Sequence, residues 1–331
     1  MIGRRALVGG LGMGLAAAVG AQTAPPSRRP GLPGPVPGLP EPRETIDLWP
    51  DGAPGMPARP PTETVNERST DPALTDRAVF GITRPRLVVF RPRVPNGSAA
   101  LVTPGGGYRW VVIDKEGYEI GRWLAARGWT VFVLFYRLPG EGWADRADAP
   151  LQDAQRAMRL IRARARDHGV YPDRVAAMGF SAGGHLCADL ATRHASRTYV
   201  PVDAADALSA RPDLAAPIYP VQSMAEPHAH RGSRDLLLGP DPSPALVRAH
   251  SPDHNVSHET PPCFLVHAED DDVVPVENSL LLRAALKRAG VPVETHLFTH
   301  GRHGFGLRHA AGKPAEAWPE LFVSWAASHG L

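Results

Sequence analysis

The chain has 331 residues, of which 43% are hydrophobic and 21% are charged. That share of apolar residues can fill a large core, so the composition excludes an intrinsically disordered protein. The net charge is +2, and it falls to zero once Arg4 and Arg5 of the N-terminal segment are set aside. A balanced charge without long runs of one sign gives no reason to expect a nucleic-acid partner.

Residues 1–21 have the features of an export signal. Arg4 and Arg5 precede an apolar stretch of small residues, and Val19-Gly20-Ala21 suits cleavage by a signal peptidase. The arginine pair resembles a twin-arginine signal, and an ordinary secretory signal is the alternative. Because the apolar run is short and glycine-rich for a membrane span, we expect a periplasmic or secreted protein without stable membrane insertion.

Residues 22–44 are rich in proline and glycine and are predicted to form an extended linker. In residues 45–331, strand-like and helix-like segments alternate, which predicts one α/β domain with a mostly parallel central sheet and helices on both faces. Sites in such domains form at the carboxyl ends of the strands. Strands are predicted over residues 86–92, 99–104, 129–138, 174–180, 214–221, 263–270 and 293–300. Helices are predicted over residues 116–128, 150–169, 276–290 and 315–328, and directly after Ser181.

The clearest chemical signal is Gly179-Phe180-Ser181-Ala182-Gly183, a G-x-S-x-G sequence between a predicted strand and a predicted helix. A nucleophile raised above a sheet needs a tight, strained turn, and the flanking glycines let neighbouring chain approach without a clash. The N-terminus of the following helix favours a developing negative charge. We therefore predict Ser181 as the nucleophile, with a tight turn and a capping serine as the alternative.

Two later loops, each after a predicted strand, supply an acid and a base in the chain order that this kind of site requires. We predict Asp271, four residues after His267 and four before Pro275, as the acid that orients the base. His303 is the predicted base, because its glycine-rich loop can reach the serine, whereas His300 is predicted to end the strand and to have a structural role. Four carboxylates compete for the acid position, and the unused ones are expected to be solvated: Glu269, Asp270, Asp271 and Asp272.

The segment 103–110 contains three consecutive glycines after an early strand. Such a loop can turn backbone N–H groups toward an oxyanion, so Gly106, Gly107 and the amide of Ala182 are the predicted donors. A flexible glycine turn is the alternative. Tyr108 and Trp110 are predicted to line a sugar or aryl subsite, because aromatic rings stack on such groups, with core packing as an equal alternative.

Together these motifs resemble the α/β-hydrolases, and more closely the xylan esterase-like carbohydrate esterases of the acetyl xylan and feruloyl esterase types. The resemblance runs from about residue 45 to the C-terminus. Its most specific pieces are TPGGGY from Thr103, KEGYEIGRWL from Lys115, YPDRVAAMGFSAGGHLCADLA from Tyr171, DDVVPVENS from Asp271 and VPVETHLFTHGRHGFGL from Val291.

The resemblance implies Ser181 as nucleophile, Asp271 as acid, His303 as base, and Gly106 and Gly107 as the oxyanion loop. It also implies that acetyl or feruloyl groups on plant polysaccharide or oligosaccharides are hydrolysed through an acyl-enzyme, without a cofactor. The chain departs from lipase-like relatives, which carry His-Gly-Gly-Gly. It has Pro104 at the position of that histidine, which argues against the hormone-sensitive-lipase branch.

Other hypotheses are a serine peptidase of the same fold and an inactive carbohydrate-binding relative, although an intact triad speaks against the second. His250, His254 and His258 are spaced by four, as metal ligands on a helix can be, but Pro252 would disturb that helix and we expect no metal site. Cys187 and Cys263 are expected to be buried free thiols, with a disulfide between them as the alternative in an exported protein. His228 and His230 are expected to lie in an exposed loop.

Overall fold

The protein is represented by a computed structural model that describes residue 42 and residues 44–331. The predicted signal peptide and nearly all of the predicted linker lie outside the described residues. Strand β1 begins at Glu44, the last residue assigned to that linker.

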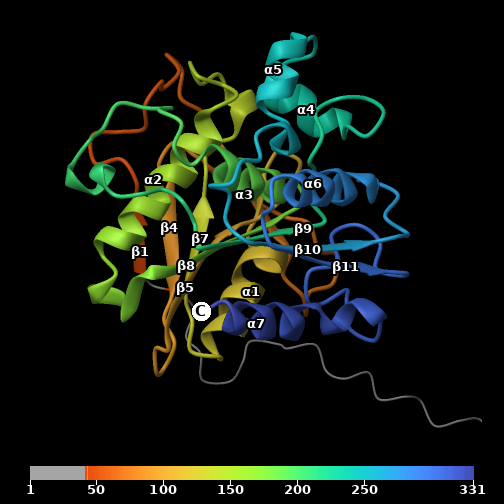
Figure 1. The fold of residues 1–331 in the computed structure, drawn as a ribbon. Coiled ribbons are helices and arrows are strands. Elements are labelled where there is room, and N and C mark those ends of the chain that lie inside the picture. Colours follow the sequence, from red (N-terminus) through yellow and green to blue (C-terminus); the bar gives the residue numbers. More distant parts are fainter. Residues whose placement is uncertain (1–41, 43) are drawn as a thin grey trace, which may run out of the picture.

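An eight-stranded sheet runs through the middle of the described chain (Figure 1). Strands β7, β5, β8, β9, β10 and β11 run parallel, and β4 and β1 are added antiparallel at one edge. In spatial order the strands are β1 (Glu44–Asp47), β4 (Arg86–Phe90), β7 (Thr130–Phe135), β5 (Gly97–Thr103), β8 (Val170–Phe180), β9 (Leu214–Ile218), β10 (Cys263–Ala268) and β11 (Val293–Phe298). The prediction of a mostly parallel sheet is confirmed.

The central strands are apolar along their whole length because both faces of the sheet are covered. Every residue of β5, β7, β9 and β10 is buried. A strand with only one buried face would alternate between apolar and polar residues, and these strands do not. Each of the seven predicted strands overlaps an observed strand, because a continuous apolar run between turn signals is a local feature of the sequence.

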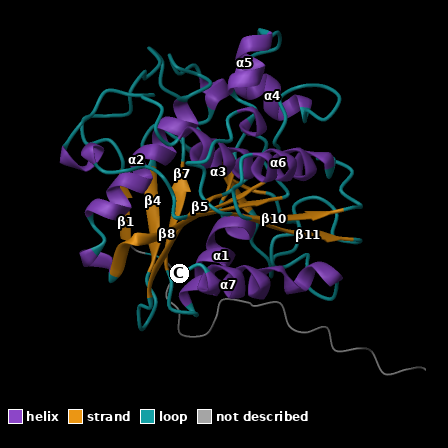
Figure 2. Ribbon diagram, in the orientation of Figure 1, coloured by secondary structure: helices purple, strands orange, loops and turns teal. Residues whose placement is uncertain are grey.

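Helices pack on both faces of the sheet (Figure 2). One face carries α1 (Glu119–Ala125) and α7 (Trp318–Ser328). The other carries α2 (Ala149–Ala163), α3 (Ala182–Arg193) and α6 (Glu277–Arg288). Two predicted helices differ in detail from the structure. The predicted helix at 116–128 begins as a π-helical segment, Asp114–Tyr118, and the helix predicted to reach residue 169 ends at Ala163.

Besides strand β1, two parts of the fold have no counterpart among the predicted elements. One is a small antiparallel sheet of β2 (Thr64–Glu67), β3 (Arg77–Phe80) and β6 (Val111–Val112). The other is a helical insertion after β9, with α4 (Arg231–Leu238) and α5 (Pro244–Ala249). All four residues of β2 are exposed, so no apolar pattern marks the strand, and its pairing partner lies elsewhere in the chain.

Both cysteines are buried and unpaired, as predicted. Burial raises the pKa of the Cys187 thiol to about 12, so this thiol stays protonated and unreactive at neutral pH. Within residues 44–331, no helix has the length and apolar character needed to cross a bilayer.

Candidate active site

Ser181 lies at the junction of β8 and α3, where the backbone is strained. Its φ of 54° and ψ of −119° are unusual for a residue with a side chain. The surrounding backbone holds this conformation: Ser181 N–H donates to the Ile218 carbonyl at 3.1 Å, and the Ser181 carbonyl accepts from the N–H groups of His185 and Val221. The serine is therefore presented at the carboxyl edge of the sheet by a turn that its neighbours enforce.

The two glycines that flank this turn are required by close backbone contacts. A Cβ on Gly183 would lie 2.1 Å from the carbonyl oxygen of Thr103, and a Cβ on Gly179 would lie 2.1 Å from the carbonyl oxygen of Gly183. Real Cβ atoms do not come so close to backbone oxygens. The close approach inferred from the sequence is therefore present, and it packs the end of β5 against the first turn of α3.

The structure brings the predicted serine, histidine and aspartate together. Ser181 Oγ lies 2.8 Å from His303 Nε2, and His303 Nδ1 lies 2.7 Å from Asp271 Oδ2. With Nδ1–H donating to the carboxylate, Nε2 is left to accept the serine proton. The ring of Tyr219 packs against the His303 ring at a centroid distance of 5.3 Å, which limits how the imidazole can turn.

Asp271 is held by several donors at once. Its Oδ1 accepts the N–H groups of Val273 and Val274, and its Oδ2 also faces His267 Nε2 at 3.2 Å. Burial alone would raise the pKa of Asp271, but hydrogen bonds from His267, His303 and the Val274 N–H hold that pKa well below its usual range. The carboxylate is therefore ionised throughout the neutral pH range.

The other acids of this loop occupy different environments. Asp270 Oδ1 accepts the N–H groups of Gly301 and Arg302 at 2.8 and 2.7 Å, so Asp270 shapes the backbone of the loop that carries His303. Glu269 and Asp272 are exposed. Of the four competing carboxylates, only Asp271 contacts the imidazole of His303.

Gly106 and Gly107 lie on the wall of a cleft of about 400 Å³ that is also lined by His303, the partner of Ser181. The Gly106 carbonyl accepts from the N–H groups of Arg109 and Trp110, which folds the glycine loop back on itself. Among the described residues, the N–H groups of Gly106, Gly107 and Ala182 have no hydrogen-bond acceptor. They are therefore available to a ligand oxygen, as the oxyanion prediction requires.

The prediction that Tyr108 lines a substrate subsite is wrong. Its side chain is 1% exposed, and its hydroxyl donates to His185 Nδ1 at 2.6 Å. His185 Nε2–H in turn donates to the His250 carbonyl at 2.8 Å. Burial lowers the pKa of His185 to about 4, so the imidazole is neutral and can accept the tyrosine proton. Tyr108 therefore anchors the glycine loop to α3, and the open alternative of core packing applies.

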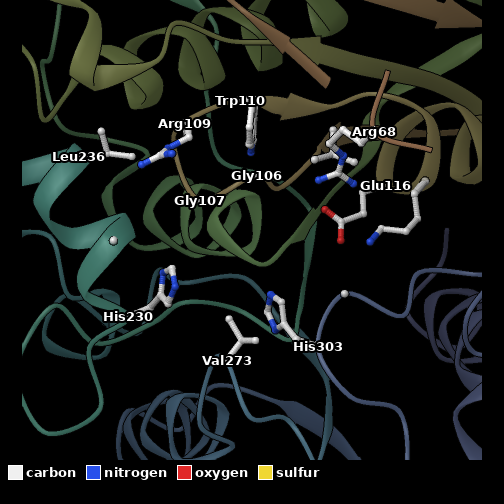
Figure 3. Close-up of a pocket in the computed structure, with 14 residues that line it drawn as sticks. Arg68, Gly106, Gly107, Arg109, Trp110, Glu116, His230, Leu236, Val273 and His303 are labelled. Carbon is white, nitrogen blue, oxygen red and sulfur yellow. The ribbon is translucent and has the colours of Figure 1, made fainter. Parts of the chain in front are cut away.

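Trp110 does line the cleft, together with residues that the sequence did not single out (Figure 3). Trp110 and His303 face each other across its middle, Arg109 and His230 lie toward one end, and Arg68 lies toward the other. The expectation that His228 and His230 belong to an exposed loop is also wrong, since both side chains are half-buried and His230 caps α4. Its Nδ1 accepts the N–H of Ser233, which leaves Nε2 as the free nitrogen of the ring.

Glu116 is a buried carboxylate that connects the two loops of the site. Its Oε2 accepts the N–H of Gly105 at 2.9 Å, beside the predicted oxyanion donors. Its Oε1 accepts the hydroxyl of Tyr219 at 3.1 Å, and that hydroxyl accepts the N–H of Gly306, three residues after His303. Glu116 is 3% exposed. No sequence signal marked it, because a carboxylate at the start of a helix is ordinarily a surface residue.

The described residues contain no group of three or more His, Cys, Asp or Glu side chains that could hold a metal ion. The three histidines spaced by four do not lie on one helix. The chain leaves α5 at His250, which is buried against α3 and within 3.2 Å of Arg193.

Residues 96–286, more than half of the chain, match the BD-FAE family. The chain belongs to this family. The BD-FAE match covers the glycine loop, Ser181 and Asp271. His303 lies beyond the end of the match.

Individual relatives agree with the BD-FAE assignment. The chain is 34% identical over 226 residues to an acetylxylan esterase of Xylanibacter ruminicola, an alignment covering 67% of this chain and 44% of that protein. It is 36% identical to endo-1,4-beta-xylanase B of Butyrivibrio fibrisolvens, with coverage of 68% and 34%. The chain thus spans less than half the length of these curated relatives.

A solved structure extends the likeness over most of the domain. The acetyl ester-xyloside bifunctional hydrolase of Caldicellulosiruptor lactoaceticus is 37% identical, with a TM-score of 0.70. The match covers 88% of this chain and 98% of that one. The α/β-hydrolase fold of this BD-FAE protein, and the resemblance to xylan esterase-like proteins, are therefore confirmed.

The Glu116 contacts predict a specific kinetic defect in this BD-FAE protein. Both groups that face the carboxylate are donors, so the amide of a Glu116→Gln variant can accept from only one of them. We expect kcat for an acetyl ester to fall about tenfold, with little change in KM, because one buried donor loses its acceptor near the oxyanion loop. Steady-state kinetics on 4-nitrophenyl acetate measure this. Glu277→Gln, an exposed glutamate on α6, is the matched control. A Glu116→Gln enzyme with lower thermal stability but unchanged kcat would show that the carboxylate has only a structural role.

Proposed function

We propose that the chain is an exported serine carboxylic-ester hydrolase that removes acyl groups, chiefly acetyl, from plant polysaccharides or oligosaccharides. One observation carries the proposal: Ser181, His303 and Asp271 form a continuous hydrogen-bonded series beside an open cleft. Membership of the BD-FAE family, and the ester-hydrolase names of similar proteins, support this choice of chemistry.

The geometry supports a two-step reaction. His303 Nε2 takes the proton of Ser181 while Oγ attacks the ester carbonyl, and the ionised Asp271 stabilises the resulting imidazolium. The free N–H groups of Gly106, Gly107 and Ala182 bind the oxyanion. The sugar hydroxyl leaves with the proton from His303, and a water activated by the same histidine hydrolyses the acyl-enzyme.

The substrate proposal rests on the relatives and on the cleft wall. Two similar proteins carry acetylxylan esterase and acetyl ester-xyloside hydrolase in their names. The half-exposed Trp110 offers an aromatic face on which a sugar ring can stack. We take acetyl as the preferred acyl group, and feruloyl as the alternative.

A substrate panel tests the proposal. Purified enzyme is incubated with acetylated xylo-oligosaccharides, a feruloylated arabinoxylan oligosaccharide, 4-nitrophenyl acetate and a chromogenic peptide amide. We expect acetate release from the first and rapid hydrolysis of the third, with the peptide amide unchanged. Cleavage of the peptide alone would favour a peptidase, and no turnover together with no fluorophosphonate labelling would indicate an inactive relative. Fractionation of cells that produce the full-length chain tests export, which rests on residues 1–21 alone.

A further inference from the structure

The cleft beside the serine and histidine carries an excess of positive charge. Three cationic side chains line it, those of Arg68, Arg109 and Lys115, against the single carboxylate of Glu116. Glu116 is buried, and both of its oxygens already accept hydrogen bonds from within the protein. Arg68 is paired with Asp76 at 2.5 Å. The remaining cations, Arg109 and Lys115, are therefore the groups to consider as ligand contacts.

Neither Arg109 nor Lys115 is committed to a partner. In residues 44–331, no hydrogen bond or ion pair joins either side chain to another residue. Arg109 is exposed and lies at the end of the cleft that also holds His230 (Figure 3). Lys115 lies close to the base: its Nζ would be 3.2 Å from a Cβ placed on Gly304, the residue after His303. One uncommitted cation thus lies at the end of the cleft that holds His230, and another lies beside the residue that follows the base.

This arrangement has a physical consequence for the choice of substrate. A neutral glycan can offer only hydroxyl groups to these two cations, so their charge would add little to its binding. A carboxylate forms short, charge-assisted hydrogen bonds with guanidinium and ammonium groups. A cleft lined by charge of one sign also concentrates ligands of the opposite sign.

We propose that the cleft selects O-acetylated glycans that carry uronic acid carboxylates beside the acetylated sugar, with Arg109 and Lys115 binding those carboxylates. The inference rests on the proposed esterase function and adds the substrate class. A uronate branch on an acetylated xylan and the backbone of an acetylated galacturonan offer the same chemistry.

Matched substrate pairs test this inference. The first pair is an acetylated xylo-oligosaccharide with and without a glucuronic acid branch. The second is an acetylated oligogalacturonide and its methyl ester, which has nearly the same size without the charge. Acetate release gives kcat/KM for each at 20 mM and 500 mM NaCl. We expect about a tenfold preference for the charged member of at least one pair at low salt, and a smaller preference at high salt. The pair that shows it identifies the source of the uronate.

Variants locate the contacts. Arg109→Gln and Lys115→Met are each expected to reduce the charge preference severalfold, and Arg93→Gln, an exposed arginine in the loop before β5, is the matched control. Two outcomes would overturn the inference in an enzyme that still hydrolyses 4-nitrophenyl acetate. One is an equal kcat/KM for the two members of both pairs, and the other is a charge preference that is unchanged in both cleft variants. Failure of the enzyme to hydrolyse any of these esters would instead contradict the proposed function.

Discussion

Replacement of Ser181 by alanine is expected to reduce kcat for 4-nitrophenyl acetate by at least about 10⁴-fold, because no other group can form the acyl-enzyme. The hydroxyl is the atom that His303 Nε2 faces at 2.8 Å, and the residue lies in a strained turn that packing maintains. The variant retains the cleft and the amides of Gly106 and Gly107, so a small residual rate is expected from binding and oxyanion stabilisation. Initial rates per mole of purified protein, with the concentration of each enzyme taken from its absorbance, measure the loss.

The control for this prediction is Ser209→Ala, which removes an exposed hydroxyl. That variant should keep the full rate and should still be labelled by the fluorophosphonate. Labelling of Ser181→Ala, or retention of more than a few per cent of its activity, would assign the nucleophile to another residue. Circular dichroism of both variants establishes that the fold is intact.

The second large effect is expected for Asp271→Asn, with a decrease in kcat of about 10⁴-fold. Asparagine has nearly the same shape, but its amide cannot stabilise an imidazolium and can hold His303 in the wrong tautomer. The carboxylate is shielded from water and held by the N–H groups of Val273 and Val274, so water cannot substitute for its charge. Because hydrogen bonding keeps the pKa of Asp271 below the usual carboxyl range, activity should not fall with protonation of this acid anywhere near neutral pH.

Neighbouring acids provide the controls for Asp271→Asn. Asp272→Asn changes an exposed residue and should leave kcat within about twofold of the parent enzyme. Asp270→Ala should have an intermediate effect, because it removes the Oδ1 that accepts the N–H groups of Gly301 and Arg302 and orders the histidine loop. If Asp272→Asn abolished activity and Asp271→Asn did not, the triad drawn from the geometry would be incorrect.

Features that depend on residues close together in the chain could be predicted from the sequence. The apolar strands are recognisable because each is covered on both faces, so each one appears in the sequence as a continuous run of apolar residues. The turn at Ser181 is recognisable because its two glycines stand within one five-residue segment. A side chain on Gly179 or Gly183 would clash with nearby backbone. The order of serine, acid and histidine along the chain, combined with strand ends at one sheet edge, also predicted which loops would meet.

The direction of individual side chains, and the distant segments that they contact, depend on how the folded elements pack. Tyr108 turns inward because His185 of α3 accepts its hydroxyl, a contact 77 residues away in the chain. Asp271 differs from its acidic neighbours through its contact with His303, 32 residues on. Glu116 joins two loops through Tyr219, 103 residues away. Such contacts depend on packing between elements rather than on the local sequence pattern. The side chains of a glycine-rich loop or an acidic run can point in several directions, and packing in the folded protein selects one of them.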